Sequence, residues 1–134
     1  MRTMGTVIAV KAIILNAQKE VLLLKRNDDD SIDGGMWDIP GGRAEDDESL
    51  ENALRREVEE ETSLHVEVSS LHTGWTYQLN NGERLLGYTF LCSITCEYAV
   101  KLSHEHSEYR WVKLSNIDAY NMHENLKREI KLVV

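Results

Sequence analysis

With 134 residues and a formal net charge of −8, the sequence fits one domain with a single core and opposes binding along the phosphate backbone of long DNA or RNA. No apolar run is long enough to cross a membrane, and Lys11 interrupts the N-terminal apolar run, so we expect neither a membrane span nor a signal peptide. The two cysteines, Cys92 and Cys96, are too few for the disulfide framework of a secreted mini-protein, which makes the reducing cytoplasm the expected location.

The first part of the chain predicts two strands and a loop. Residues 7–15 are rich in Val, Ile and Ala, and residues 21–24 repeat this character after a short polar stretch, which predicts a β-hairpin. Residues 27–35 are acidic and end in two glycines, a composition typical of loops.

A pair of glycines follows the only proline of the sequence. Residues 37–40 lead into Gly41 and Gly42. Because glycine has no Cβ, such a segment can adopt positive φ angles and approach a ligand closely. An ordinary tight turn explains the same composition, and the sequence leaves both interpretations open.

The next segment predicts an amphipathic helix. Asp46 and Asp47 can accept the free amide hydrogens of its first turn, so we expect the helix to begin near Glu48. It should end near Ser63. Its buried stripe consists of the apolar residues at helical spacing, Leu50, Ala53, Leu54 and Val58.

The remaining elements are predicted to be three strands and a helix. Residues 65–79 and 84–95 have the composition of strands, and residues 80–82 form the turn between them. A further strand is expected at residues 109–114. Residues 122–134 predict a C-terminal amphipathic helix that turns Leu126, Ile130 and Val133 inward.

The most informative feature is a group of acids on the predicted helix. Glu57, Glu60 and Glu61 project within one sector that overlaps the apolar stripe, so they point along the protein body. They repel one another and lie near the helix C-terminus, where the helix dipole disfavours anions. Arg55 and Arg56 are too few to neutralise them. A solvated acidic face is the plain alternative, but a divalent cation held by carboxylate oxygens explains the crowding better.

The charged residues of this segment resemble the Nudix box. The match comprises Gly42, Glu48, Arg56, Glu57, Val58, Glu60, Glu61 and Leu64, and its single departure is Ser63, where the family typically has glycine. The flanking segment WDIPGG and the later segment EHSEYRWVKL also resemble the corresponding parts of a MutT-like domain. The resemblance implies one Nudix hydrolase domain over residues 1–134, with the box at residues 42–64. The implied fold is α/β, an α/β/α sandwich with a mixed β-sheet between helices.

The resemblance also implies the chemistry. Family members typically use Mg²⁺, for which Mn²⁺ can substitute, to hydrolyse a phosphoanhydride bond in a nucleoside diphosphate linked to another group, by attack of water on phosphorus. The leading substrates are a nucleoside triphosphate, oxidised or noncanonical forms included, and a nucleotide sugar. ADP-ribose and dinucleoside polyphosphates are the alternatives. The oligomeric state stays open, a homodimer included.

Residue roles follow from the same resemblance. The implied metal ligands are Glu57, Glu60, Glu61, the backbone carbonyl of Gly41, and Glu105. Glu57 and Glu105 are the two candidates for the general base. Arg56 is expected to orient the glutamates through charge-assisted hydrogen bonds, and Glu48 to support them.

Two functions of other classes compete with hydrolysis. A non-catalytic nucleotide-binding sensor on the same fold would have no reason to keep every metal-binding glutamate. An acidic calcium-binding protein is disfavoured because the run at residues 28–30 lacks the ligand spacing of an EF-hand. His104 and His106 flank Glu105, but no tetrahedral spacing supports a zinc site. Magnesium-dependent release of phosphate or pyrophosphate separates these functions.

Overall fold

The centre of the fold is formed by strands that are apolar on both faces. We describe residues 5–94 and 99–133 in a computed structural model. Alternate residues of β1 (Thr6–Leu15) pack into different clusters, with Val10 on one face of the sheet and Ile13 on the other. In the same way, β2 (Glu20–Arg26) turns Leu22 and Leu24 to one face and Leu23 to the other. This double burial explains why both strands are continuous apolar runs rather than alternating patterns.

One mixed sheet joins all the described strands. The others are β3 (Trp37–Asp38), β4 (Gly41–Arg43), β5 (Val66–Gln78), β6 (Arg84–Ile94) and β7 (His106–Lys113). The main order is β3-β2-β1-β6-β5, while β4 pairs with β1 and β7 pairs with β2. Among these described strands, only the pairing of β1 with β6 is parallel. The predicted hairpin is confirmed, although β1 meets β2 only at Leu15 and Val21.

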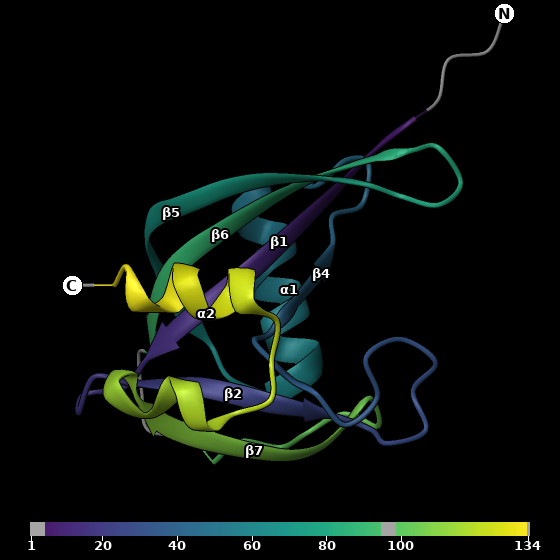
Figure 1. The fold of residues 1–134 in the computed structure, drawn as a ribbon. Helices are drawn as coiled ribbons and strands as arrows, with labels where there is room; N and C mark the ends of the chain where they lie inside the picture. The colour runs from purple at the N-terminus through teal and green to yellow at the C-terminus, as the bar shows by residue number, and fades with distance from the viewer. Residues whose placement is uncertain (1–4, 95–98, 134) are drawn as a thin grey trace, which may run out of the picture.

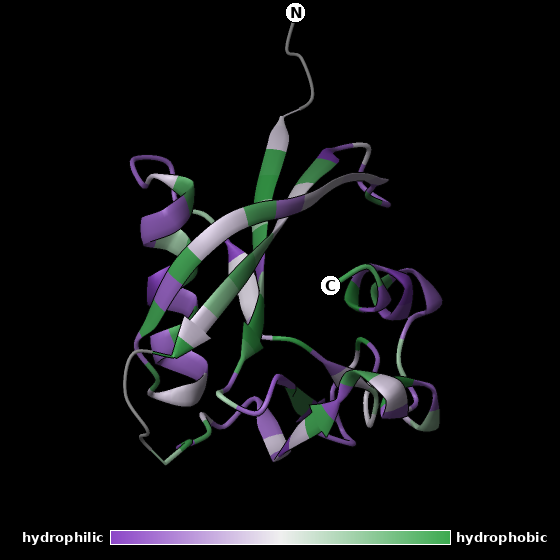
Figure 2. Cartoon of the chain, turned by 90° about the vertical axis from the view of Figure 1, so that its left-hand side faces the viewer, coloured by the Kyte–Doolittle hydropathy of each residue, from purple (hydrophilic) through white to green (hydrophobic). Residues whose placement is uncertain are grey.

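Helices cover both faces of the sheet. Helix α1 (Leu50–Thr62) packs on one face, and the 3-10 helix η1 (Leu114–Ala119) and α2 (Glu124–Lys131) pack on the other. Figure 1 shows α2 in front of the strands and α1 behind them, and the edge-on view of Figure 2 places the strands between the two helices. The predicted α/β/α sandwich is confirmed. In the described part of the chain, no helix is both long and apolar enough to span a bilayer.

The predicted start of α1 is wrong, whereas its end and its stripe are confirmed. Ser49 is the N-cap, and its hydroxyl accepts the amide hydrogen of Asn52 at 3.1 Å. The helix therefore begins at Leu50, because Glu48 is held outside it by a hydrogen bond from the Glu45 amide. At the other end, Ser63 adopts the left-handed conformation with φ 64°.

The later elements differ from the prediction mainly at their ends. The turn between β5 and β6 is confirmed, with Gly82 at φ 88°. Strand β7 begins at His106, earlier than predicted, because it pairs with β2 along its whole length. The 3-10 helix was not predicted. In α2 Ile130 is fully buried, as expected. Thr95, Cys96 and Val134, which the predictions include, lie outside the described residues.

Replacing the observed cap tests the corrected start of α1. Ser49→Ala should lower the free energy of unfolding by about 1 kcal/mol, because it removes the acceptor for a first-turn amide. Asp47→Ala should change it by less than about 0.5 kcal/mol. Chemical denaturation of the variants and the unmodified protein measures both effects. An equal or larger loss in Asp47→Ala would restore the original cap assignment.

Candidate functional site

The glycine pair brings strand β4 against β1 and α1. A Cβ on Gly41, whose φ is 153°, would lie 2.1 Å from the carbonyl oxygen of Val10. A Cβ on Gly42 would lie 2.6 Å from the carboxyl group of Glu57. A real Cβ does not come this close to backbone atoms, so position 41 requires glycine, whereas a side chain at position 42 would force the Glu57 carboxyl group to move. In the structure, Gly41 and Gly42 lie in strand β4 and the close approach of Gly42 is to a carboxylate on α1, so approach to a ligand stays a prediction.

The three glutamates of the acidic group are buried to very different degrees. The whole residue Glu61 is only 5% exposed, whereas the side chains of Glu57 and Glu60 are 15% and 58% exposed. Glu57 and Glu61 therefore lie along the protein body as predicted. The prediction is wrong for Glu60, which lies at the margin of the apolar stripe and faces largely into solvent.

Arg56 gathers three of the acids around its guanidinium group. It donates to both oxygens of Glu48 at 2.7 and 2.8 Å, to Glu57 at 3.0 Å, and to Glu60 at 3.4 Å. It also donates to the backbone carbonyl of Arg43 at 3.1 Å, which ties α1 to β4. The bonds from Arg56 lower the pKa of Glu48 to about 2. The positive charge of Arg56 is thus shared among acids that do not include Glu61.

Glu61 is left as a buried carboxyl group with little compensation. Burial raises its pKa to about 8, while the amide of Gly41, which donates to Glu61 at 3.3 Å, and the charge of Lys11 act in the opposite direction. The negative charges of Glu57 and Glu105 raise the pKa further. Burial also raises the pKa of Glu57, which shares a hydrogen bond with Glu61. Burial thus favours the protonated form of Glu61, and a raised pKa at both members of the pair reflects how poorly this place accommodates two negative charges.

The donor set at this place suits a hard divalent cation. Its candidate ligand atoms are all oxygens, from the carboxylates of α1 and the backbone at the glycine pair, and the absence of a Cβ on Gly42 lets the carboxyl group of Glu57 lie against β4. Within residues 5–94 and 99–133, no three His, Cys, Asp or Glu side chains already converge as a ligand group. The ligand roles of Glu57, Glu60, Glu61 and Gly41 stay predictions.

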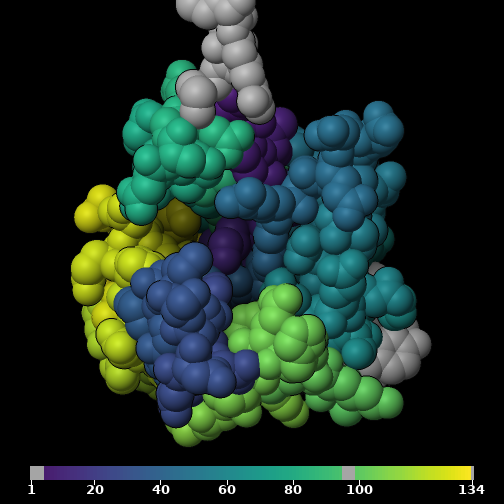
Figure 3. Space-filling view, turned by 90° about the vertical axis from the view of Figure 1, so that its right-hand side faces the viewer, coloured from purple at the N-terminus to yellow at the C-terminus, as the bar shows by residue number. Residues whose placement is uncertain are grey.

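Glu105 lies at the same end of α1, on the segment that precedes β7. The amide of Ser103 in that segment donates to the carbonyl oxygen of Glu61 at 3.2 Å. Figure 3 shows a hollow in the molecular surface between α1, the loop after β2 and this segment, with β1 at its floor. The structure thus brings Glu105 near Glu61, as their electrostatic interaction also indicates.

Two charged residues beside Glu61 were not recognised as site residues in the sequence. Lys11 and Asp38 form an ion pair of 3.0 Å, and Arg26 lies 3.7 Å from the same Asp38 oxygen. Lys11 was noticed only as a break in an apolar run, although one lysine inside a buried strand is itself a signal for a paired or functional charge. Next to this group, His106 is 8% exposed and its Nδ1 has no protein partner among the described residues.

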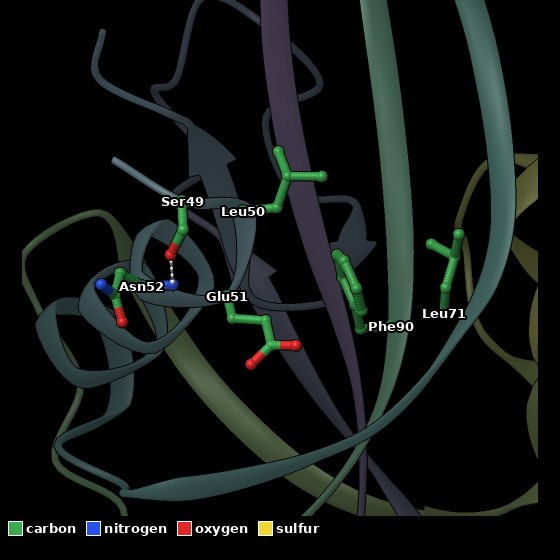
Figure 4. A pocket seen from close by; sticks show the side chains of 6 residues that line it. All are labelled: Ser49, Leu50, Glu51, Asn52, Leu71 and Phe90. Atoms are coloured by element: carbon green, nitrogen blue, oxygen red, sulfur yellow. Dashed lines mark hydrogen bonds between the residues drawn. The ribbon is translucent and has the colours of Figure 1, made fainter. Parts of the chain in front are cut away.

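Two shallow pockets lie outside the centre of the hollow. One of about 420 Å³ adjoins Glu105 and is lined by Arg26, Asn27, Asp29, Asp30, His104 and Glu105. The other, of about 440 Å³, lies between the start of α1 and strands β5 and β6, and is lined by Ser49, Leu50, Glu51, Asn52, Leu71 and Phe90. Figure 4 shows that the Ser49 hydroxyl in this second pocket is used for capping. This second pocket contains none of the predicted site residues, whereas the first pocket contains Glu105, so the first pocket is the one related to the site.

Comparisons with known proteins agree with this arrangement. The family model described as NUDIX domain matches residues 5–133. The nucleoside triphosphatase NudI of Escherichia coli K12 is 28% identical over 121 residues, which cover 83% of this chain and 85% of that protein. The solved structure of a MutT protein from Methanosarcina mazei Go1 is 30% identical with a TM-score of 0.81, and the match covers 98% of this chain and 94% of the other. A Caenorhabditis elegans Ap4A hydrolase, 21% identical with a TM-score of 0.76, shares the fold; that match covers 93% of each chain.

The raised pKa of Glu61 predicts how the stability of the metal-free protein depends on pH. Folding raises this pKa from 4.5 to about 8, so the stabilising contribution is complete below pH 4.5 and is lost as the pH rises to about 8. In the presence of EDTA, the free energy of unfolding contributed by this group should fall by up to about 1.4 kcal/mol per pH unit in that window. Denaturant titrations between pH 5.5 and 8.5 measure it.

Glu61→Gln, which cannot ionise, is the matched control. Its unfolding free energy should depend less steeply on pH than that of the unmodified protein. Identical slopes for the two proteins would show that Glu61 is not a buried acid with a raised pKa.

Proposed function

The chain belongs to the Nudix hydrolase family, and from this premise we propose that it hydrolyses a phosphoanhydride bond of a nucleoside triphosphate with the help of Mg²⁺. The observation that carries the proposal is the intact carboxylate set of α1, with Glu61 buried where the amide of Gly41 donates to it and with Glu57 packed against Gly42. The printed activity of the relative NudI, a nucleoside triphosphatase, supports this substrate class. Oxidised and noncanonical nucleotides are included in it.

The residues of the site can divide the work of binding the cation. Glu57, Glu60, Glu61 and the carbonyl of Gly41 would hold it. When bound, a divalent cation neutralises the charge of the diphosphate and lowers the pKa of the attacking water. Mg²⁺ suits this oxygen donor set, and Mn²⁺ can replace it. Arg56 fixes Glu57 and Glu48 by charge-assisted bonds, so that these acids need little reorganisation.

The geometry favours Glu105 over Glu57 as the general base. Glu57 already accepts a hydrogen bond from Arg56 at 3.0 Å, which holds its carboxylate. Glu105 is exposed, on a segment that borders the hollow. In the proposed step, the oxygen of water forms a bond to phosphorus, the bond from phosphorus to the bridging oxygen breaks, and Glu105 takes the proton of the water.

A substrate panel tests the proposed function. The purified protein is incubated with Mg²⁺ and nucleoside triphosphates, 8-oxo-dGTP, a nucleotide sugar, ADP-ribose and a dinucleoside polyphosphate, and the products are identified. We expect the highest kcat/KM with a nucleoside triphosphate, and loss of turnover in EDTA that Mg²⁺ or Mn²⁺ restores. A higher kcat/KM with one of the other classes would make that class the substrate in place of a nucleoside triphosphate. Binding without turnover of any compound would favour the sensor function.

Substitution of the proposed ligands tests their role. Glu60→Gln and Glu61→Gln should each lower kcat with Mg²⁺ by at least about 100-fold, because each removes a ligand charge needed in the transition state. Both variants should keep the circular dichroism spectrum of the unmodified protein. Glu59→Gln is the control, since Glu59 is exposed on the same helix, and its kcat should be unchanged. Normal turnover by folded Glu60→Gln and Glu61→Gln would refute the assigned ligands.

A further inference from the structure

Asn27 holds the segment that carries Glu105 at two consecutive peptide groups. Its backbone amide donates to the carbonyl oxygen of Glu105 at 3.3 Å. Its side-chain amide donates to the carbonyl oxygen of His104. Asn27 follows directly on β2, at a point where the register of β2 with β7 shifts between Lys25 and Arg26. One residue at the end of a central strand therefore binds the peptide groups before and after Glu105.

The opposite side of the same segment is attached to α1. The amide of Lys101 donates to the carbonyl oxygen of Thr62 at 2.9 Å, and the amide of Ser103 donates to that of Glu61 at 3.2 Å. Hydrogen bonds therefore hold the segment from Lys101 to Glu105 on two sides, to the C-terminal end of α1 and to Asn27. Figure 3 shows this segment touching the loop after β2 below the hollow.

These hydrogen bonds restrict the position of the backbone that carries the Glu105 carboxylate. The α1 bonds act before Glu105, whereas the bonds from Asn27 act at its own peptide group and at the one before it. Without the side-chain amide of Asn27, the carbonyl of His104 loses that donor, and only the backbone amide of Asn27 holds Glu105 from this side. Catalytic groups must be held within about 0.5 Å of the productive position, because a misplacement of about 1 Å can cost about 100-fold in rate.

We propose that Asn27 is a positioning residue for the hydrolytic reaction, which acts by holding the Glu105 carboxylate over the substrate phosphate. The proposal rests on the proposed function, and in particular on Glu105 as the general base. An ordinary contact between two loops would stabilise the fold without changing the chemical step. Only a positioning role couples Asn27 to Glu105 in the rate of reaction.

The first measurement separates the rate of the chemical step from substrate binding. Asn27→Ala should lower kcat by at least about 10-fold and change KM by less than about 2-fold. Asn27→Asp keeps the size of the side chain but removes the amide donor, so it should lose kcat to a similar extent. Asn81→Ala removes another loop asparagine whose side-chain amide is bonded, in the turn before β6, and should keep normal kcat. Unchanged kcat in both Asn27 variants, with thermal melting confirming that they fold, overturns the proposal.

The second measurement is a double-mutant cycle with Glu105→Gln. If Asn27 acts through Glu105, Asn27→Ala should lower kcat by less than about 2-fold in the Glu105→Gln background. Losses that multiply overturn the positioning role and leave the proposed function intact. Normal kcat in Glu105→Gln overturns both the assigned base and this proposal, whereas absence of turnover by the unmodified protein overturns the proposed function with it.

Discussion

The burial of one carboxyl group, that of Glu61, constrains the rest of the site. Helix α1 uses one stripe for two purposes, because Leu54 and Val58 fill the core and Glu61 continues their line one turn later. A charge in this position is costly unless it is compensated. Partial compensation comes from β4, where the amide of Gly41, at a position that requires glycine, donates to Glu61. Folding therefore buries the carboxyl group of Glu61 beside the backbone of β4.

The surrounding charges are arranged so that Glu61 is not neutralised by the protein itself. Arg56 forms its strongest bonds with Glu48, away from Glu61, and Lys11 is paired with Asp38. The site thus combines an ordered set of acids with too little positive charge to neutralise them. That combination stabilises the folded chain poorly at high pH but suits a protein that binds a cation together with a polyphosphate.

Local sequence patterns predicted much of this structure, whereas features that depend on pairing between distant residues could not be predicted. The continuous apolar runs of β1 and β2 and the stripe of α1 indicated their burial, and the acids of α1 indicated a candidate site. The predicted cap of α1 was wrong because several polar residues that could cap a helix precede it. In addition, Arg56, two turns into the helix, binds Glu48, which lies outside the helix. The start of β7 depends on its register with β2, and the bonds between Asn27 and the Glu105 segment join residues far apart in the chain. Neither leaves a periodic signal in the sequence.

The location of a bound cation tests the central claim most directly. Crystals of the protein soaked in Mn²⁺ would show the ion by its anomalous scattering. The account predicts a peak between the carboxyl group of Glu61 and the glycine pair, with Glu57 and Glu60 turned toward it, and no such peak in crystals of Glu61→Gln. Glutamates that extend into solvent with no ion between them, at saturating Mn²⁺ and above pH 8, would contradict it.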